Sequence, residues 1–206
     1  MKIPLRYQMT EFDCGPTSLL NALSFLFERE ELAPEIIRNI MLFSLDAYGA
    51  DGFSGKNGTT HAAMMFLSQW LNGFGKTGRL DITSSYITDR DVNLNPGSRL
   101  RDALARKGAA VVRLDLDGWH YVLLTNVKDD RVYMFDPYLL PDKCPLSDVC
   151  CSSDREYAYN RIVSINRMDS VELHPYALGP WETREAVLLF NGKTMLTEGN
   201  TIEYII

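Results

Sequence analysis

The 206-residue chain is short of histidine, of basic charge and of long hydrophobic runs. It has 3 histidines, and its 27 Asp and Glu residues outnumber 21 Lys and Arg residues, which gives a formal net charge of −6. An acidic chain is a poor partner for nucleic acid or an anionic membrane surface, so we expect neither. No apolar run approaches the roughly 20 residues that a membrane helix needs. The N-terminus also lacks the apolar segment of a signal peptide. We therefore expect a cytoplasmic protein without a membrane span.

Cysteine is scarce as well, with 4 residues, at positions 14, 144, 150 and 151. In a reducing compartment, disulfides are not the default interpretation. Cys144 and the adjacent Cys150 and Cys151 could suggest a metal cluster. The nearest histidine, His174, lacks the tight ligand spacing of a zinc site. We expect no metal and no cofactor here, and we interpret the segment as a loop with unpaired thiols.

Helical patterns fill the first half of the chain. Apolar residues at helical spacing predict helices that begin near Pro16, Pro34 and Thr60 and end near residues 29, 45 and 71. Asn72-Gly73 is expected to close the third helix. A fourth, short helix is predicted from Ser98, its cap, to Gly108, just past its end. The second helix is expected to direct four apolar side chains inward, Ile36, Ile37, Ile40 and Met41.

Strand patterns dominate the second half. The runs AAVVRLDL, WHYVLLTNV and RVYMFDP are separated by the tight turns Asp117-Gly118 and 128–130, which predicts an antiparallel meander. An earlier strand is predicted over residues 80–87. RIVSIN, EAVLLF and TIEYII suit half-buried strands that join the same sheet. Helices packed on an antiparallel sheet define the α+β class. Without linker composition, we expect one domain over residues 1–206.

The stretch QMTEFDCGPTSLLNAL, residues 8–23, places Cys14 where the first helix begins. A thiol is a nucleophile only as the thiolate, and the unpaired N–H groups of a helix N-terminus favour that anion. Pro16 suits the first helical position, and Asp13 is expected to cap the helix. A cysteine at a helix start is, on that feature alone, more often structural. A catalytic role therefore requires a base and its orienting partner.

His120 and Asp136 meet that requirement in the predicted sheet. His120 opens the central strand of the meander, and Asp136 ends the next strand. Antiparallel pairing makes them neighbours at one end of the sheet. Gln8, six residues before Cys14, could direct a side-chain N–H to the same place, so that Gln8 and the backbone N–H of Cys14 hold an oxyanion. We expect no chemistry from His61.

Two further features bear on the expected cleft. Trp119 either lines it or packs on the edge of the core. The glycine-rich loop of residues 49–58 is no phosphate-binding loop, because Gly55-Lys56 is followed by Asn57 rather than Ser or Thr. We interpret this loop as a mobile flap or a wall of the cleft.

Together these motifs resemble the bacteriocin-processing peptidases, which are papain-like cysteine peptidases that cut leader peptides after a double glycine. The resemblance rests on the run from Gln8 to Pro16, on HYVLL, and on FDP, whose aspartate lies sixteen residues after His120. It covers roughly residues 1–140 and leaves 141–206 as a C-terminal extension. The resemblance implies a papain-like fold, with Cys14 as nucleophile, His120 as general base and acid, Asp136 as orienting residue and Gln8 as oxyanion donor.

From these features we expect a cysteine peptidase that hydrolyses a bond in a peptide or protein substrate. Acyl transfer to an amine by the same residues, as in a transpeptidase or amidase, is an alternative. A non-catalytic peptide-binding module with a papain-like cleft is another.

Overall fold

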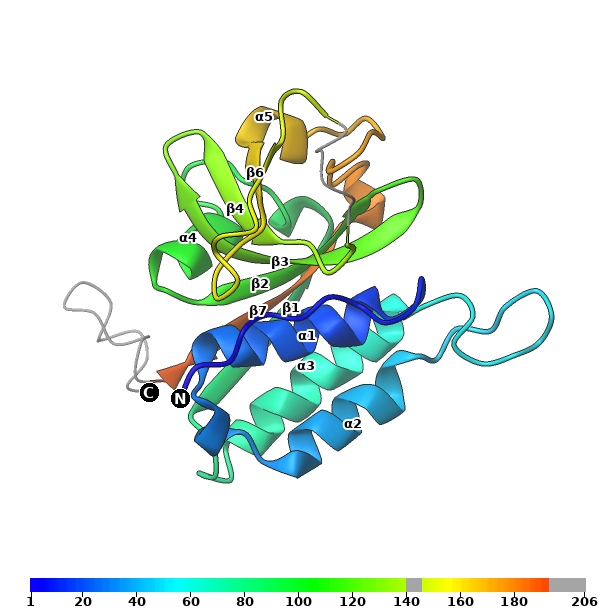
Figure 1. Cartoon of the computed structure of the whole chain (residues 1–206), viewed down its shortest axis with the longest axis vertical. Coiled ribbons are helices and arrows are strands. Elements are labelled where there is room, and N and C mark those ends of the chain that lie inside the picture. Colours follow the sequence, from blue (N-terminus) through cyan, green and yellow to red (C-terminus); the bar gives the residue numbers. More distant parts are fainter. Residues whose placement is uncertain (140–145, 193–206) are drawn as a thin grey trace.

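The computed structural model describes residues 1–139 and 146–192. Three helices from the first part of the chain form a layer against one face of a sheet (Figure 1). They are α1 (Cys14–Leu26), α2 (Pro34–Ser44) and α3 (His61–Gly75). The short helices α4 (Arg99–Ala105) and α5 (Ile165–Met168) lie on the other side of the sheet. Single 3-10 turns occupy Arg29–Glu31, Asp89–Asp91 and Trp181–Thr183.

The sheet has seven antiparallel strands in the described part of the chain, in the order β1-β7-β2-β3-β4-β6-β5. Their bounds are β1 (Ile82–Thr88), β2 (Ala109–Asp115), β3 (Trp119–Lys128), β4 (Arg131–Phe135), β5 (Cys150–Cys151), β6 (Arg161–Ser164) and β7 (Glu185–Asn191). β2, β3 and β4 form the predicted meander. The predicted mixture of helices and an antiparallel sheet is confirmed.

Two hydrophobic cores cover the two faces of the sheet. Val111, Leu123 and Val187 face the layer of α1 to α3. Val112, Val122 and Leu188, each one residue away along its strand, face α4 and the C-terminal segments. Because both faces are buried, the central strands are nearly continuous apolar runs instead of alternating ones.

The C-terminal runs join the sheet at two separate places. RIVSIN forms β6 beside β4. EAVLLF forms β7, which lies between β1 and β2. The expectation of a half-buried strand was wrong for β7, because a central strand with both faces covered buries every residue. TIEYII lies outside the described residues.

The helices differ from the predicted ones at their ends and in one face. α1 begins at Cys14, so Pro16 is its third residue, and it ends at Leu26 because Phe27 is extended. α3 continues past Asn72-Gly73 to Gly75, since Phe74 packs into the core. On α2, Ile37 and Met41 are 39% and 44% exposed, contrary to the prediction. This outer helix packs only on α1 and α3, so its buried stripe is narrow and carries Ile36 and Ile40.

The segment 141–156 was expected to be an exposed loop with unpaired thiols. Within its described residues, 146–156, most side chains are exposed, as expected, but β5 pairs with β6 and Val149 is buried. Cys151 is disulfide-bonded, which the fixed position of a paired strand allows. Cys14 and Cys150 have free thiols. A disulfide is unusual in a reducing compartment, so the cytoplasmic location stays a prediction.

The described residues contain neither a candidate metal-ion cluster nor a candidate membrane-spanning helix. No grouping of three or more His, Cys, Asp or Glu side chains there could hold a metal ion. None of the helices described has the length and apolar character to cross a membrane.

Candidate active site

Cys14 is the first residue of α1, and only 6% of its surface is exposed. Asp13 precedes it, but its carboxylate does not cap the helix, contrary to the prediction. That carboxylate instead accepts hydrogen bonds from the backbone N–H groups of Met9, at 3.0 Å, and Thr10, at 2.6 Å. Burial alone would raise the pKa of Asp13, but these hydrogen bonds outweigh it and lower the pKa. Asp13 therefore folds the turn that leads into Cys14.

His120 lies between Cys14 and Asp136. It is the second residue of β3, and Asp136 directly follows the last residue of β4. Its Nε2 is 2.8 Å from Oδ1 of Asp136. The Cys14 side chain lies close enough to His120 to help raise the pKa of its imidazole. His120 is 7% exposed and Asp136 is fully buried, so the structure brings the three side chains together in one shielded series.

The two titrating members of this series are shifted toward an ion pair. Burial alone would lower the pKa of His120, but its hydrogen bonds with Asp136 and Cys14 raise it to about 9. Burial alone would raise the pKa of Asp136, but His120, the backbone N–H of Tyr138 and the hydroxyl of Tyr176 lower it. At neutral pH the imidazole is therefore protonated and the carboxylate is ionised.

The C-terminal extension surrounds Asp136 with hydrogen bonds. The Tyr176 hydroxyl donates to Oδ2 of Asp136 at 2.9 Å. The Asn160 side chain accepts from the backbone N–H of Asp136 and donates to its carbonyl, both at 2.8 Å. Sequence reasoning missed both residues, because no motif marks them and they are 24 and 40 residues from Asp136.

Gln8 is held at the site by a backbone hydrogen bond to the residue after Asp136. Its backbone N–H donates to the carbonyl of Pro137 at 2.9 Å, so the segment before α1 runs beside the residue after Asp136. The side-chain Nε2 donates to the carbonyl of Thr10 at 2.8 Å, and Oε1 is buried without a hydrogen-bond partner. Gln8 lines the same cavity as His120. One N–H of the amide is occupied by Thr10, which leaves the second for a ligand.

Two cavities meet at Trp119. One, of about 520 Å³, is lined by Gln8, Trp119 and His120. The other, of about 540 Å³, is lined by Cys14, Trp119 and residues 57–60. Trp119 is 44% exposed, so it lines the cleft, one of its two expected positions. The end of the glycine-rich loop forms a cleft wall, in agreement with its interpretation. Cys14 and His120 therefore open onto a groove that extends on both sides of Trp119.

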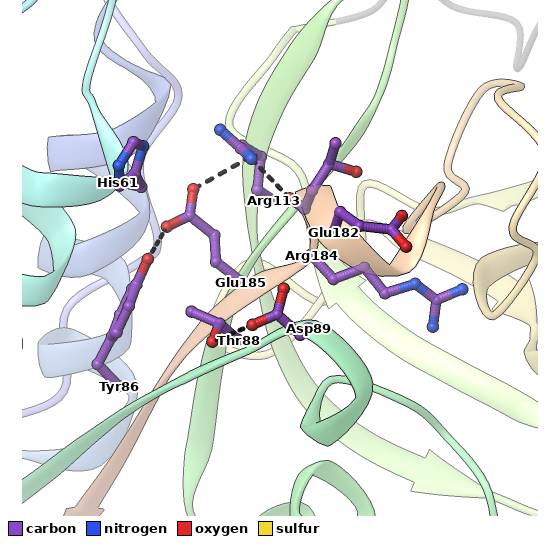
Figure 2. Close-up of a pocket in the computed structure, with 9 residues that line it drawn as sticks. His61, Tyr86, Thr88, Asp89, Arg113, Glu182, Arg184 and Glu185 are labelled. Carbon is purple, nitrogen blue, oxygen red and sulfur yellow. Dashed lines mark hydrogen bonds and ion pairs between the residues drawn. The ribbon is translucent and has the colours of Figure 1, made fainter.

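A smaller polar cavity of about 170 Å³ adjoins the Cys14 cavity, with which it shares His61 and Arg113 (Figure 2). At its base the buried carboxylate of Glu185 accepts hydrogen bonds from the hydroxyls of Tyr86 and Tyr121. Arg113 Nε lies 3.1 Å from the same carboxylate. The guanidinium of Arg113 also stands over the Trp119 ring, 4.7 Å from its centroid. This network supports Trp119 from beneath the groove.

Comparisons with known proteins give a structural likeness. No family model matches the chain, and no curated protein matches its sequence. Among solved structures, the chain is similar to a double glycine motif protease from an AMS/PCAT transporter, determined in complex with the leader peptide. The identity is 15% and the TM-score 0.39, over 79% of this chain and 90% of that chain. The papain-like assignment stays a prediction.

Proposed function

We propose that the protein is a cysteine peptidase that hydrolyses a peptide bond of a peptide or protein substrate. The observation that carries the proposal is the series of neighbouring side chains from Cys14 through His120 to Asp136, in which His120 is 2.8 Å from Asp136. A thiol at a helix N-terminus, a protonated imidazole beside it and a buried carboxylate behind the imidazole are the parts that such a reaction needs.

In the proposed reaction, His120 moves one proton in each half of the cycle. The Cys14 sulfur, as thiolate, attacks the substrate carbonyl carbon, and His120 gives its proton to the leaving amine as the peptide C–N bond breaks. The neutral imidazole then takes a proton from the water that attacks the thioester. This step releases the acid and restores the thiolate and the imidazolium. Because Nε2 contacts Asp136, Nδ1 is the nitrogen left to exchange a proton with Cys14.

Asp136 and Gln8 have supporting roles in this proposal. Asp136 keeps the imidazole in the tautomer and orientation that the transfer needs. The second amide N–H of Gln8, not used by Thr10, and the backbone N–H of Cys14 would hold the oxyanion of the tetrahedral intermediate. The Cys14 N–H is suited to this role because the first N–H groups of a helix have no intrahelical acceptor.

The test is digestion of a peptide library, read by mass spectrometry, with labelling by a thiol-reactive peptide aldehyde in parallel. Wild-type protein should cleave peptides and be labelled at Cys14, and Cys14→Ala should do neither. Cys150→Ala is the matched control, because it removes the exposed free thiol and should leave both results unchanged.

Three outcomes would contradict the proposal. Cleavage that persists in Cys14→Ala would assign the activity to another group. Peptide binding with neither cleavage nor labelling would indicate a binding module. Products joined to an added amine, with no label incorporated from isotopically labelled water, would indicate acyl transfer.

A further inference from the structure

We infer that Tyr176 is a positioning residue, which holds the carboxylate of Asp136 in the orientation that meets His120. The inference deepens the proposed function and rests on it for its catalytic meaning. It also assigns part of the site to the C-terminal extension, which the resemblance of residues 1–140 does not cover.

The two carboxylate oxygens of Asp136 have different partners. Oδ1 lies 2.8 Å from His120 Nε2 and accepts from the backbone N–H of Tyr138 at 2.8 Å. Oδ2 accepts from the Tyr176 hydroxyl at 2.9 Å. Asp136 and Tyr176 are both fully buried, and Tyr176 lines the same cavity as His120, so a water could replace the missing donor only from that cavity. The Tyr176 hydroxyl therefore fixes the rotation of the Asp136 carboxylate, so that one oxygen faces His120 while the other faces Tyr176.

Asn160 holds the backbone to which this carboxylate is attached. Its amide closes two hydrogen bonds on the N–H and C=O of Asp136, and its own N–H donates to the carbonyl of Met134 at 3.0 Å. The end of β4 is thereby fixed in position, and rotation of the Asp136 side chain remains the freedom that Tyr176 restricts.

Tyr176 is itself held on both sides. Its backbone has φ +69°, a conformation that side-chain-bearing residues rarely adopt, and its N–H donates to the carbonyl of Asp115 at 2.7 Å. The backbone N–H of Asp115 in turn donates to the carbonyl of Ala177 at 2.8 Å. The backbone around Tyr176 is thus paired to the end of β2. This pairing fixes the position from which the Tyr176 side chain reaches Asp136.

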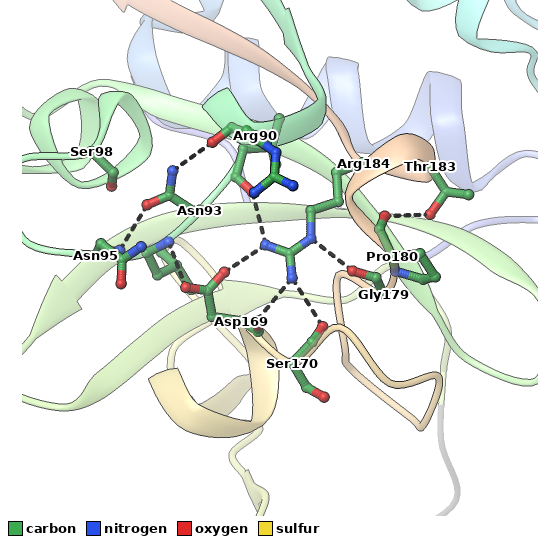
Figure 3. A network of polar contacts seen from close by, with 12 residues as sticks. Arg90, Asn93, Asn95, Ser98, Asp169, Ser170, Gly179, Pro180, Thr183 and Arg184 are labelled. Carbon is green, nitrogen blue, oxygen red and sulfur yellow. Dashed lines mark hydrogen bonds and ion pairs between the residues drawn. The ribbon is translucent and has the colours of Figure 1, made fainter.

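The buried guanidinium of Arg184 anchors the remainder of this segment (Figure 3). It donates to the carbonyl of Gly179 at 2.8 Å and to Oδ1 of Asp169 at 2.7 Å. Further donors reach the carbonyls of Val92 at 2.9 Å, Asp169 at 2.8 Å and Ser170 at 3.0 Å. The loop that carries Tyr176 is therefore tied to β7 and to the turn before α4.

Loss of the hydroxyl has a defined consequence for the proton of His120. Without the hydroxyl, the Asp136 carboxylate can turn away from the imidazole, so the ion pair is weakened and His120 loses its proton at lower pH. The other groups that bear on the pair are the thiol of Cys14 and the guanidinium of Arg161, which contacts the Tyr176 hydroxyl. Glu11 and Asp117 line the cavity that His120 opens onto. None of these groups is changed by Tyr176→Phe.

The experiment compares Tyr176→Phe with wild type by NMR titration of the histidine ring C–H signals in the full chain. The pKa of His120 should fall by roughly 0.5 to 1 unit, a part of one hydrogen bond to a charged group. His61 and His174 serve as internal references. The value of kcat/KM should fall roughly tenfold, for the same reason. Tyr86→Phe is the matched control for the titration: it loses a hydroxyl bound to the Glu185 carboxylate instead of to Asp136, and the pKa of His120 should stay at the wild-type value.

Unchanged values of the His120 pKa and of kcat/KM in Tyr176→Phe would overturn the inference. The titration does not depend on turnover, so a shift of His120 in a protein without peptidase activity would refute the proposed function and leave the positioning role supported. If Tyr176→Phe fails to fold, a measurement on the wild-type protein tests the inference instead. Its Tyr176 hydroxyl proton should be protected from solvent exchange and visible by NMR, and a freely exchanging hydroxyl would refute the inference.

Discussion

Replacement of Arg184 by Met should strongly destabilise the fold. Arg184 is among the largest fully buried side chains, and all its hydrogen-bond acceptors are protein atoms. Met keeps much of the apolar stem but leaves the Asp169 carboxylate, which is 15% exposed, without its counter-charge. It also removes the guanidinium stacked on Trp181, 3.9 Å from the ring centroid. Removing one partner of a buried ion pair costs about 3 to 5 kcal/mol, so we expect a loss of that size in the free energy of unfolding.

Urea denaturation of the two proteins measures this loss directly. Arg99→Met is the matched control, because the pair of Arg99 with Asp91 is 51% and 63% exposed, and such pairs contribute about 0 to 1 kcal/mol. Adding Asp169→Asn to Arg184→Met should restore part of the stability, since it removes the uncompensated charge. A loss no larger than that of the control would refute the reasoning and show that the network contributes little.

Four further predictions concern the site and the extension. The value of kcat/KM should fall as pH rises through about 9, because His120 then loses the proton that the leaving amine needs; a rate that stays constant well beyond this pH would contradict the assignment. Stability from the same pair should be complete below the ordinary histidine pKa of 6.5 and be lost through about 9, as thermal unfolding across pH would show. Gln8→Ala should lower the rate roughly a hundredfold to a thousandfold, and an unchanged rate would leave Gln8 only structural. Truncation after residue 140 should give an insoluble or molten product, because it removes β7 from the middle of the sheet; a soluble, active product would show that the extension is a separate module.

Features that depend on neighbouring residues could be predicted from the sequence. The two tight turns of the meander fix the order of β2, β3 and β4, and with it the approach of His120 to Asp136. The apolar stripe behind Cys14 predicts a helix that begins close to it, although the structure starts α1 two residues before the expected Pro16. These inferences need only local turn chemistry and periodicity.

Features that depend on distant partners could not be predicted. Nothing within EAVLLF specifies that it lies between β1 and β2, because burial on both faces suits any central position. Periodicity assigned Ile37 and Met41 to a buried face, but the width of that face depends on how α1 and α3 pack against α2. Tyr176 and Asn160 reach Asp136 only after the extension has folded back across the sheet.

The central position of β7 also determines when the sheet can form during synthesis of the chain. β1 and β2 are synthesised early, yet in the described structure β7 lies between them and pairs with both. Their facing edges therefore have no partner strand until Glu185–Asn191 has been made. At about 5 to 20 residues per second, the interval between β2 and β7 lasts on the order of several seconds. Tyr176 and Asn160 also arrive within it. A nascent chain therefore carries Cys14, His120 and Asp136 for some time before the sheet closes, so the order of synthesis itself delays the final form of the candidate site until residues 185–191 have been made.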